Sequence, residues 1–188
     1  FTTKNSKAET VTYTATAGGV TIANTASITF QAGAVSALAS TVQVSKASVA
    51  SDGTDSSTVT VTLMDVNNNP ISGKSVTLSQ GSGSSAISPS SGVTTNASGQ
   101  ATFTVTSTKS ETVTYTAKDA TDNITLNSTG SITFTAGAAS PTLSTLSASK
   151  ATANADGTDS TTITVTLRDV NGNLINNRAV TLGQGSGS

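Results

Sequence analysis

The sequence repeats itself with a period of 104 residues, and this period constrains the fold more than any other feature. The string DGTDS at Asp52–Ser56 returns at Asp156–Ser160, and QGSGS at Gln80–Ser84 returns at Gln184–Ser188. SITF at Ser27–Phe30 also returns 104 positions later. A unit of about 100 residues has the size of one domain and is too long for one turn of a solenoid. We therefore expect a tandem array of similar domains.

The frame of the repeat divides the chain into three parts. ETVTYTA at Glu9–Ala15 returns at Glu111–Ala117, an offset of 102, so the later copy carries two extra residues. We predict the last part of one repeat at residues 1–35, a complete repeat at 36–139 and the first part of the next at 140–188. The chain is expected to be a segment of a longer array.

Most segments alternate apolar and polar residues, which is the pattern of a half-buried β-strand. Val59, Val61 and Leu63, for example, alternate with threonines. Threonine is β-branched and tolerates water on its hydroxyl side, so these strands belong to antiparallel sheets with one wet face. The pattern predicts strands at Ser40–Val49, Ser57–Met64, Ser75–Ser79, near Val93, and at Gly99–Ser107, Glu111–Lys118 and Ile124–Phe134.

Turn signals such as Asp52-Gly53 and Ser98-Gly99 separate these segments, and no helical stripe of apolar residues is present in the sequence. Seven short strands in about 100 residues predict an all-β fold of seven-stranded immunoglobulin-like β-sandwiches arranged end to end. All six aromatic residues fall on the inward phase of a predicted strand. We therefore expect these rings to lie in the core, with none left to form an exposed platform for sugars.

Composition excludes several classes of function. Charged residues make up 10 % of the chain and the net charge is −1, so there is no basic surface for nucleic acid. The chain has no cysteine and no histidine, and therefore lacks the usual thiol nucleophiles and general bases of enzymes. No run of about 18 apolar residues is present, so we expect no membrane insertion of this segment. The protein is not expected to be an enzyme.

The complete repeat resembles the bacterial immunoglobulin-like (Big-1) domains of the invasin and intimin type. The matching motifs lie at Asp52-Gly53, Thr58–Leu63, Asp65–Ile71, Val76–Leu78, Thr94–Gly99 and Thr112–Ala117. Asn68 stands where this family usually has glycine in the turn, and the third copy has Gly172 there. The resemblance implies an extracellular, rod-like protein of the bacterial cell surface, whose repeats hold a binding tip away from the cell. It does not imply the ligand.

One motif imitates a calcium-binding loop. Asp65, Asn67 and Asn69 have the spacing of the first ligands of such a loop. The sixth position, however, is Pro70 and the twelfth is Val76, where the loop needs glycine and a bidentate glutamate. The sequence favours a β-turn rich in Asx residues.

Other carboxylates could hold a calcium ion that bridges two domains. The candidate calcium ligands of the complete repeat are Asp52, Asp55, Asp65, Asp119 and Asp122. Short Asp-Gly turns need no metal, and few carboxylates are available to each domain. We therefore expect no cofactor.

Two functions remain open. Short, alanine-rich joins at Ala32–Ser40 and Ala136–Ser144 predict a stiff rod, and hence structural stalk repeats whose partners are neighbouring repeats of the same chain or fibre. The alternative is a module that binds a glycan or a protein, such as a host or cell-surface ligand, through its end loops. Its ligand loop would be the segment that holds the two-residue insertion. The residues predicted there are Lys118, Asp119, Asp122, Asn123 and Asn127.

Overall fold

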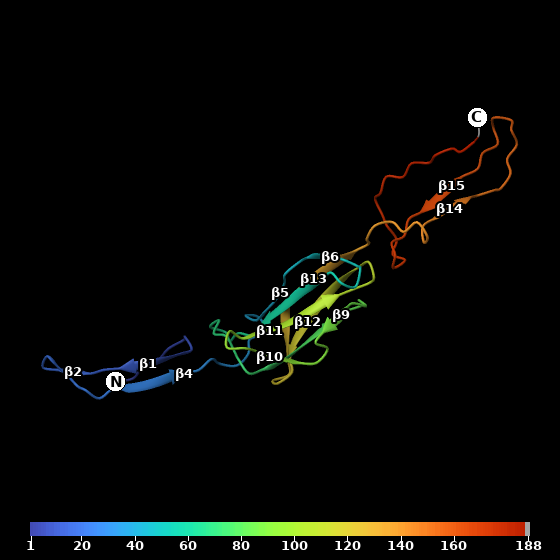
Figure 1. Cartoon of the computed structure of the whole chain (residues 1–188). Helices are drawn as coiled ribbons and strands as arrows, with labels where there is room; N and C mark the ends of the chain where they lie inside the picture. The colour runs from blue at the N-terminus through green and yellow to red at the C-terminus, as the bar shows by residue number, and fades with distance from the viewer. Residues whose placement is uncertain (187–188) are drawn as a thin grey trace.

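A computed structural model describes residues 1–186, and every regular element in this range is a β-strand (Figure 1). No helix long and apolar enough to cross a membrane occurs among these residues. The strands are β1 (Glu9–Tyr13), β2 (Thr16–Ala17), β3 (Val20–Thr21), β4 (Ala26–Phe30), β5 (Thr41–Val44), β6 (Ser48–Ala50), β7 (Ser57–Thr62), β8 (Ser75–Gln80), β9 (Ala86–Ser88), β10 (Val93–Thr94), β11 (Gln100–Thr106), β12 (Glu111–Asp119), β13 (Ile124–Thr135), β14 (Thr145–Ala148) and β15 (Ile163–Thr166).

Strands β5 to β13, residues 41–135, form a β-sandwich within the segment predicted as the complete repeat, 36–139, which we call the central repeat. One sheet has the order β10-β8-β12-β13-β6 and the other has the order β5-β7-β11-β9. Neighbouring strands are antiparallel except that β6 runs parallel to β13, with Val49 opposite Phe134. This arrangement confirms the predicted all-β, immunoglobulin-like fold.

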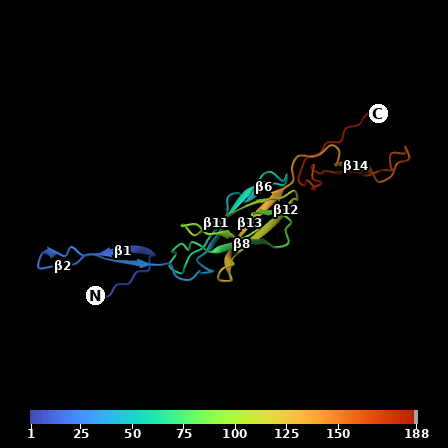
Figure 2. The same cartoon turned by 60° about the horizontal axis from the view of Figure 1, so that its bottom comes forward.

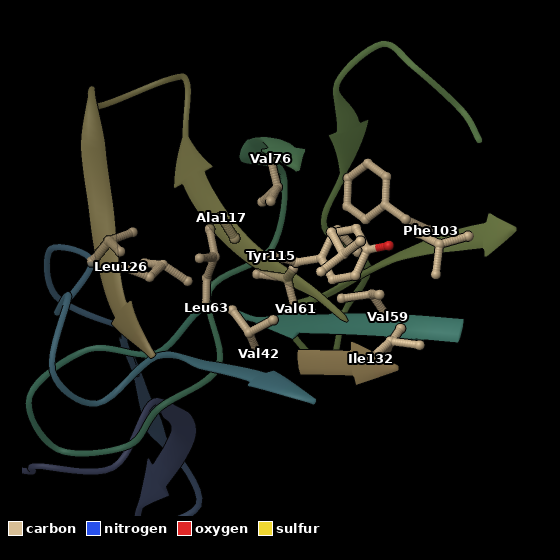
Figure 3. Close-up of a cluster of buried hydrophobic side chains, with 14 of the residues drawn as sticks. Val42, Val59, Val61, Leu63, Val76, Phe103, Tyr115, Ala117, Leu126 and Ile132 are labelled. Atoms are coloured by element: carbon tan, nitrogen blue, oxygen red, sulfur yellow. The ribbon is translucent and has the colours of Figure 1, made fainter. Parts of the chain in front are cut away.

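The alternation of apolar and polar residues along the strands determines which side chains form the core. Val59, Val61 and Leu63 of the β7 segment are fully buried, as are Val113 and Tyr115 of β12. Figure 3 shows Val59, Val61 and Tyr115 among the apolar side chains that converge between the two sheets. The cluster of buried apolar residues extends from Val35 to Phe134. The central repeat therefore encloses a core made from its own residues and from Val35, which immediately precedes it.

The sandwich differs from the prediction in its number of strands. The segment Ser40–Val49, predicted as one strand, is two: β5 pairs with β7, whereas β6 crosses to the other sheet and pairs with β13. The short strand β9 was not predicted and pairs with β11. These two changes raise the number of strands from seven to nine. The last predicted strand, β13, continues to Thr135.

The terminal segments form smaller sheets. In residues 1–35, β1 pairs with β4 and β2 with β3, and after the sandwich β14 pairs with β15. The two segments extend from opposite ends of the sandwich (Figures 1 and 2). The prediction that all six rings lie in a core is wrong for Phe1, which lies outside any strand, and for Tyr13, whose ring is exposed; Phe30 is half-buried.

Candidate functional site at the joints between repeats

The turn Asp65–Asn69, at the end of the sandwich next to residues 1–35, is held by its own first residue. The Asp65 side-chain oxygen Oδ1 accepts hydrogen bonds from the backbone N–H groups of Asn67 (2.8 Å) and Asn69 (2.9 Å). Asn68 adopts a left-handed backbone with φ of 64°, a conformation that asparagine tolerates better than most residues. The predicted Asx-rich turn is therefore present.

The second oxygen of Asp65, Oδ2, binds the connection from the preceding segment. It accepts a hydrogen bond from the backbone N–H of Gly33 (2.8 Å) and one from Nδ2 of Asn69 (2.9 Å). Asp65 is buried. The hydrogen bond from the Asn69 side chain, followed by that from Gly33, lowers the pKa of Asp65 from 3.8 to about 2.

Asn69 then connects the turn to the preceding segment. Its Oδ1 accepts a hydrogen bond from the backbone N–H of Ala8 (2.8 Å), and its Nδ2 donates to the backbone carbonyl of Ser6 (2.8 Å). Asn69 is buried, with 7 % of its surface exposed. We call the contact between successive repeats a joint, and this one, between residues 1–35 and the central repeat, is the first joint.

The second joint, between the central repeat and residues 140–188, has the same construction. Asn173 lies 104 positions after Asn69. Its Oδ1 accepts from the N–H of Ser110 (2.8 Å), and its Nδ2 donates to the carbonyl of Thr108 (2.9 Å). Asp169 accepts from Nδ2 of Asn173 (2.8 Å) and from the N–H of Gly137 (3.1 Å). Each of these hydrogen bonds has its counterpart in the first joint.

Asp169 is 1 % exposed, and its pKa is lowered, as that of Asp65 is. Burial alone would raise the pKa of Asp169, but hydrogen bonds from Asn173, Gly137 and Asn171 outweigh that effect and lower the pKa. Both joints therefore contain a carboxylate that is held in its charged form by N–H donors.

Ser51 adds contacts to the second joint. Nδ2 of Asn171 donates to the Ser51 carbonyl (2.8 Å), and Nδ2 of Asn173 also reaches Ser51 Oγ (3.2 Å). Ser51 is itself fixed, because its N–H and its hydroxyl both donate to the carbonyl of Thr135 (2.9 Å each). The end of the central repeat thus offers fixed groups to the segment that follows.

The connections between repeats are attached to the sandwich that follows them. The N–H of Ser36 donates to the Met64 carbonyl (2.8 Å), and 104 positions later Ser140 donates to Arg168 (2.7 Å). Because each connection is bonded at this point and also at Gly33 or Gly137, little of it is free to bend.

The candidate calcium ligands do not lie together in the structure. Asp55 forms an ion pair with Lys46 (2.6 Å), and Asp122 forms one with Lys74 (2.8 Å). Asp52 accepts hydrogen bonds from the N–H groups of its own loop. In residues 1–186 no three acidic side chains gather closely enough to hold a metal ion. Asp65, the first ligand of the calcium-like motif, is part of the joint instead.

The predicted ligand loop connects β12 to β13 at the same end of the sandwich as the Asp65–Asn69 turn. Of the residues predicted for it, Asp122 and Asn123 lie in the loop, whereas Lys118 is on β12 and Asn127 on β13, and all four are exposed. Asp119 is completely buried, with one oxygen bonded to the N–H of Thr121 (2.9 Å) and the other without a partner. The exposed surface of this loop is therefore formed without Asp119.

The hydrogen bonds of the first joint predict a low titration midpoint for Asp65. A group whose pKa is lowered on folding stabilises the fold above its ordinary pKa, here 3.8, and this stabilisation is lost as the pH falls toward 2. We expect the side-chain carboxyl carbon of Asp65 to titrate near pH 2 in an NMR experiment. A midpoint near 3.8 would show that the joint does not hold this carboxylate.

Comparison with known proteins identifies the class. The sequence matches the family of bacterial Ig-like domains, group 1, over residues 39–139 and again over 143–188. These matches cover most of the chain, and the protein belongs to this family. No match is found among curated protein sequences.

Solved structures of adhesins have the same fold. Invasin, described as a bacterial integrin-binding protein, is 26 % identical with a TM-score of 0.65, over 90 % of this chain and 34 % of invasin. FdeC, an adhesin of Escherichia coli, is 26 % identical with a TM-score of 0.62, over 88 % of this chain and 52 % of FdeC. InvD of Yersinia pseudotuberculosis shares the fold at 23 % identity and a TM-score of 0.64, over 89 % of this chain and 52 % of InvD. This chain thus spans between a third and about half the length of each.

Proposed function

We propose that these repeats are structural stalk repeats of a bacterial cell-surface adhesin or extracellular filament. The observation that carries the proposal is the repetition of one joint: the turns at 65–69 and 169–173 make equivalent hydrogen bonds to the repeats before them. A joint that is built twice in the same way holds successive repeats in one relative orientation. Such an array separates a binding region from the cell by a fixed distance.

The outer faces of the sandwich also fit a stalk. Thr58, Thr102, Thr104 and Thr114 are exposed on the two sheets, and the net charge of the chain is only −1. Neutral, hydroxyl-bearing faces have little apolar surface or charge with which to attract other proteins. The similarity to invasin and FdeC supports a place at the extracellular, bacterial cell surface.

The experiment that tests this function asks whether a repeat binds a ligand by itself. Residues 35–139, the central repeat with Val35, contain the whole cluster of buried apolar residues and can be produced as one protein. We expect it to bind neither an array of glycans nor proteins extracted from host cell surfaces. Specific binding would favour the alternative, a glycan- or protein-binding module. Loss of that binding on replacing exposed Asp122 or Asn123 would place the site in the β12–β13 loop.

A further inference from the structure

The carboxamide of Asn69 makes two opposite hydrogen bonds to the preceding segment. It donates to the Ser6 carbonyl and accepts from the Ala8 N–H, two main-chain groups that lie two residues apart. A peptide group in a neighbouring β-strand presents one donor and one acceptor in the same way. The side chain of Asn69 therefore replaces a strand partner at the end of the preceding repeat.

The partner groups that the two joints share are main-chain groups, so these shared contacts do not depend on side-chain identity. Ser6 corresponds to Thr108 and Ala8 to Ser110, yet both pairs make the same bonds to asparagine. The asparagine, in contrast, is the same residue in both joints. The contacts common to both joints thus require a particular side chain on one repeat and a backbone conformation on the other.

The carboxylate next to each asparagine orients its amide group. Oδ2 of Asp65 accepts from Asn69 Nδ2, and Oδ2 of Asp169 accepts from Asn173 Nδ2. Because a carboxylate can only accept, it turns the NH₂ group toward itself and leaves the amide oxygen to face the N–H of the preceding repeat. The aspartate therefore selects the amide orientation that fits the partner.

We propose that the Asp-x-x-x-Asn turn is the recognition element of the joint, with Asn69 and Asn173 as the residues that fix the orientation of each repeat on the one before it. Its partner is the loop between β11 and β12 at the end of another repeat of this kind. This inference rests on the proposed stalk function, because a stalk is what would use a fixed orientation between repeats. The contact itself is supported by the hydrogen bonds described above, and it can be tested independently of the stalk function.

A protein made of two copies of residues 36–139 in tandem contains both halves of a joint. The first copy supplies Thr108 and Ser110, and the second supplies Asp65 and Asn69. We expect the amide of Ser110 in the first copy to exchange with solvent about fivefold faster when Asn69 of the second copy is replaced by alanine, because the net contribution of a neutral hydrogen bond corresponds to about this factor.

Two control variants distinguish the loss of the joint hydrogen bond from other effects of a substitution nearby. Val66→Ala changes an exposed, apolar side chain of the same turn and should leave the exchange of Ser110 unchanged. Thr108→Ala in the first copy removes only a side chain and should also have no effect, since the partner group is the carbonyl. Asn69→Asp keeps an acceptor but loses the donor and places a second carboxylate beside Asp65, so it should accelerate exchange at least as much as Asn69→Ala.

Three results would overturn the proposal. The first is equal exchange of the Ser110 amide with and without Asn69. The second is a rise at Ser110 that accompanies lost protection of Val61 in the second copy, which would mean that Asn69 stabilises its own repeat rather than the joint. The third is an effect of Thr108→Ala as large as that of Asn69→Ala. None of these results would show that a repeat binds a ligand, so failure of this inference is distinguishable from failure of the stalk proposal.

Discussion

Replacing Tyr115 by alanine is expected to lower the free energy of unfolding of the central repeat by about 3–5 kcal/mol, as for other large core residues. Tyr115 lies on β12 between the two sheets and is fully buried (Figure 3). Its hydroxyl group is hydrogen-bonded to Ser85 Oγ at 2.7 Å, so the ring and its polar end both have partners. Urea denaturation of the whole chain measures the effect.

Tyr13 provides the matched control, because it occupies the same place in the repeat, 102 positions earlier. Its ring is exposed, and its hydroxyl pairs only with the exposed Thr3. Tyr13→Ala should change stability by no more than about 1 kcal/mol. Equal losses for the two variants would show that the sandwich core is not centred on Tyr115.

Replacing Gly99 by alanine should cost the central repeat at least about 3 kcal/mol, from a left-handed backbone and from overpacking together. Gly99 has φ of 72°, and an added Cβ would lie 2.6 Å from the carbonyl oxygen of Leu63 and 2.9 Å from the nitrogen of Ile71. Both contacts are with backbone atoms, which cannot move aside as a flexible side chain can. The same denaturation experiment applies.

Gly73 separates the two contributions. Its φ of 77° is nearly the same, but nothing lies within 4 Å of an added Cβ. Gly73→Ala should therefore cost only the backbone penalty, about 1–2 kcal/mol. If Gly99→Ala lowers the free energy of unfolding by no more than Gly73→Ala, Gly99 does not lie as close to the backbone of Leu63 and Ile71 as described.

Alternation of residues was sufficient to predict which side of each strand is buried. Val59, Val61 and Leu63 were predicted to lie on one side of their strand from their spacing alone, and all three are buried. The pattern is strong here because threonine occupies nearly every outward position of these strands. A period of two has only two phases, so such a clear contrast leaves little ambiguity.

The same pattern could not show which sheet each segment joins. Within residues 40–49 the apolar positions change phase, from Val42 and Val44 to Val49, and β5 and β6 belong to different sheets. A change of phase indicates a break in the strand, but it does not show that the chain crosses to the other sheet. Strand pairing, which distinguishes the sheets, is set by residues distant in the sequence, such as Phe134 opposite Val49.

The role of Asn69 was also hidden, because its partners lie 61 and 63 positions away in another repeat. Within the turn, Asp65 and Asn69 fit both a calcium loop and an Asx turn. One signal could have found the joint: Asp65 and Asn69 return as Asp169 and Asn173, whereas Asn68 and Pro70 change. A turn that needed only a suitable backbone would have less reason to keep this particular pair.

The central claim is that successive repeats are held at one orientation, and a distance distribution across the joint tests it most directly. The chain has no cysteine, so Thr104→Cys in each of two tandem copies of 36–139 gives a single pair of spin labels on exposed strand positions. Double electron–electron resonance should give one narrow peak, which broadens in Asn69→Ala. A broad distribution in the unmodified tandem protein, as for domains on a flexible tether, would contradict the claim.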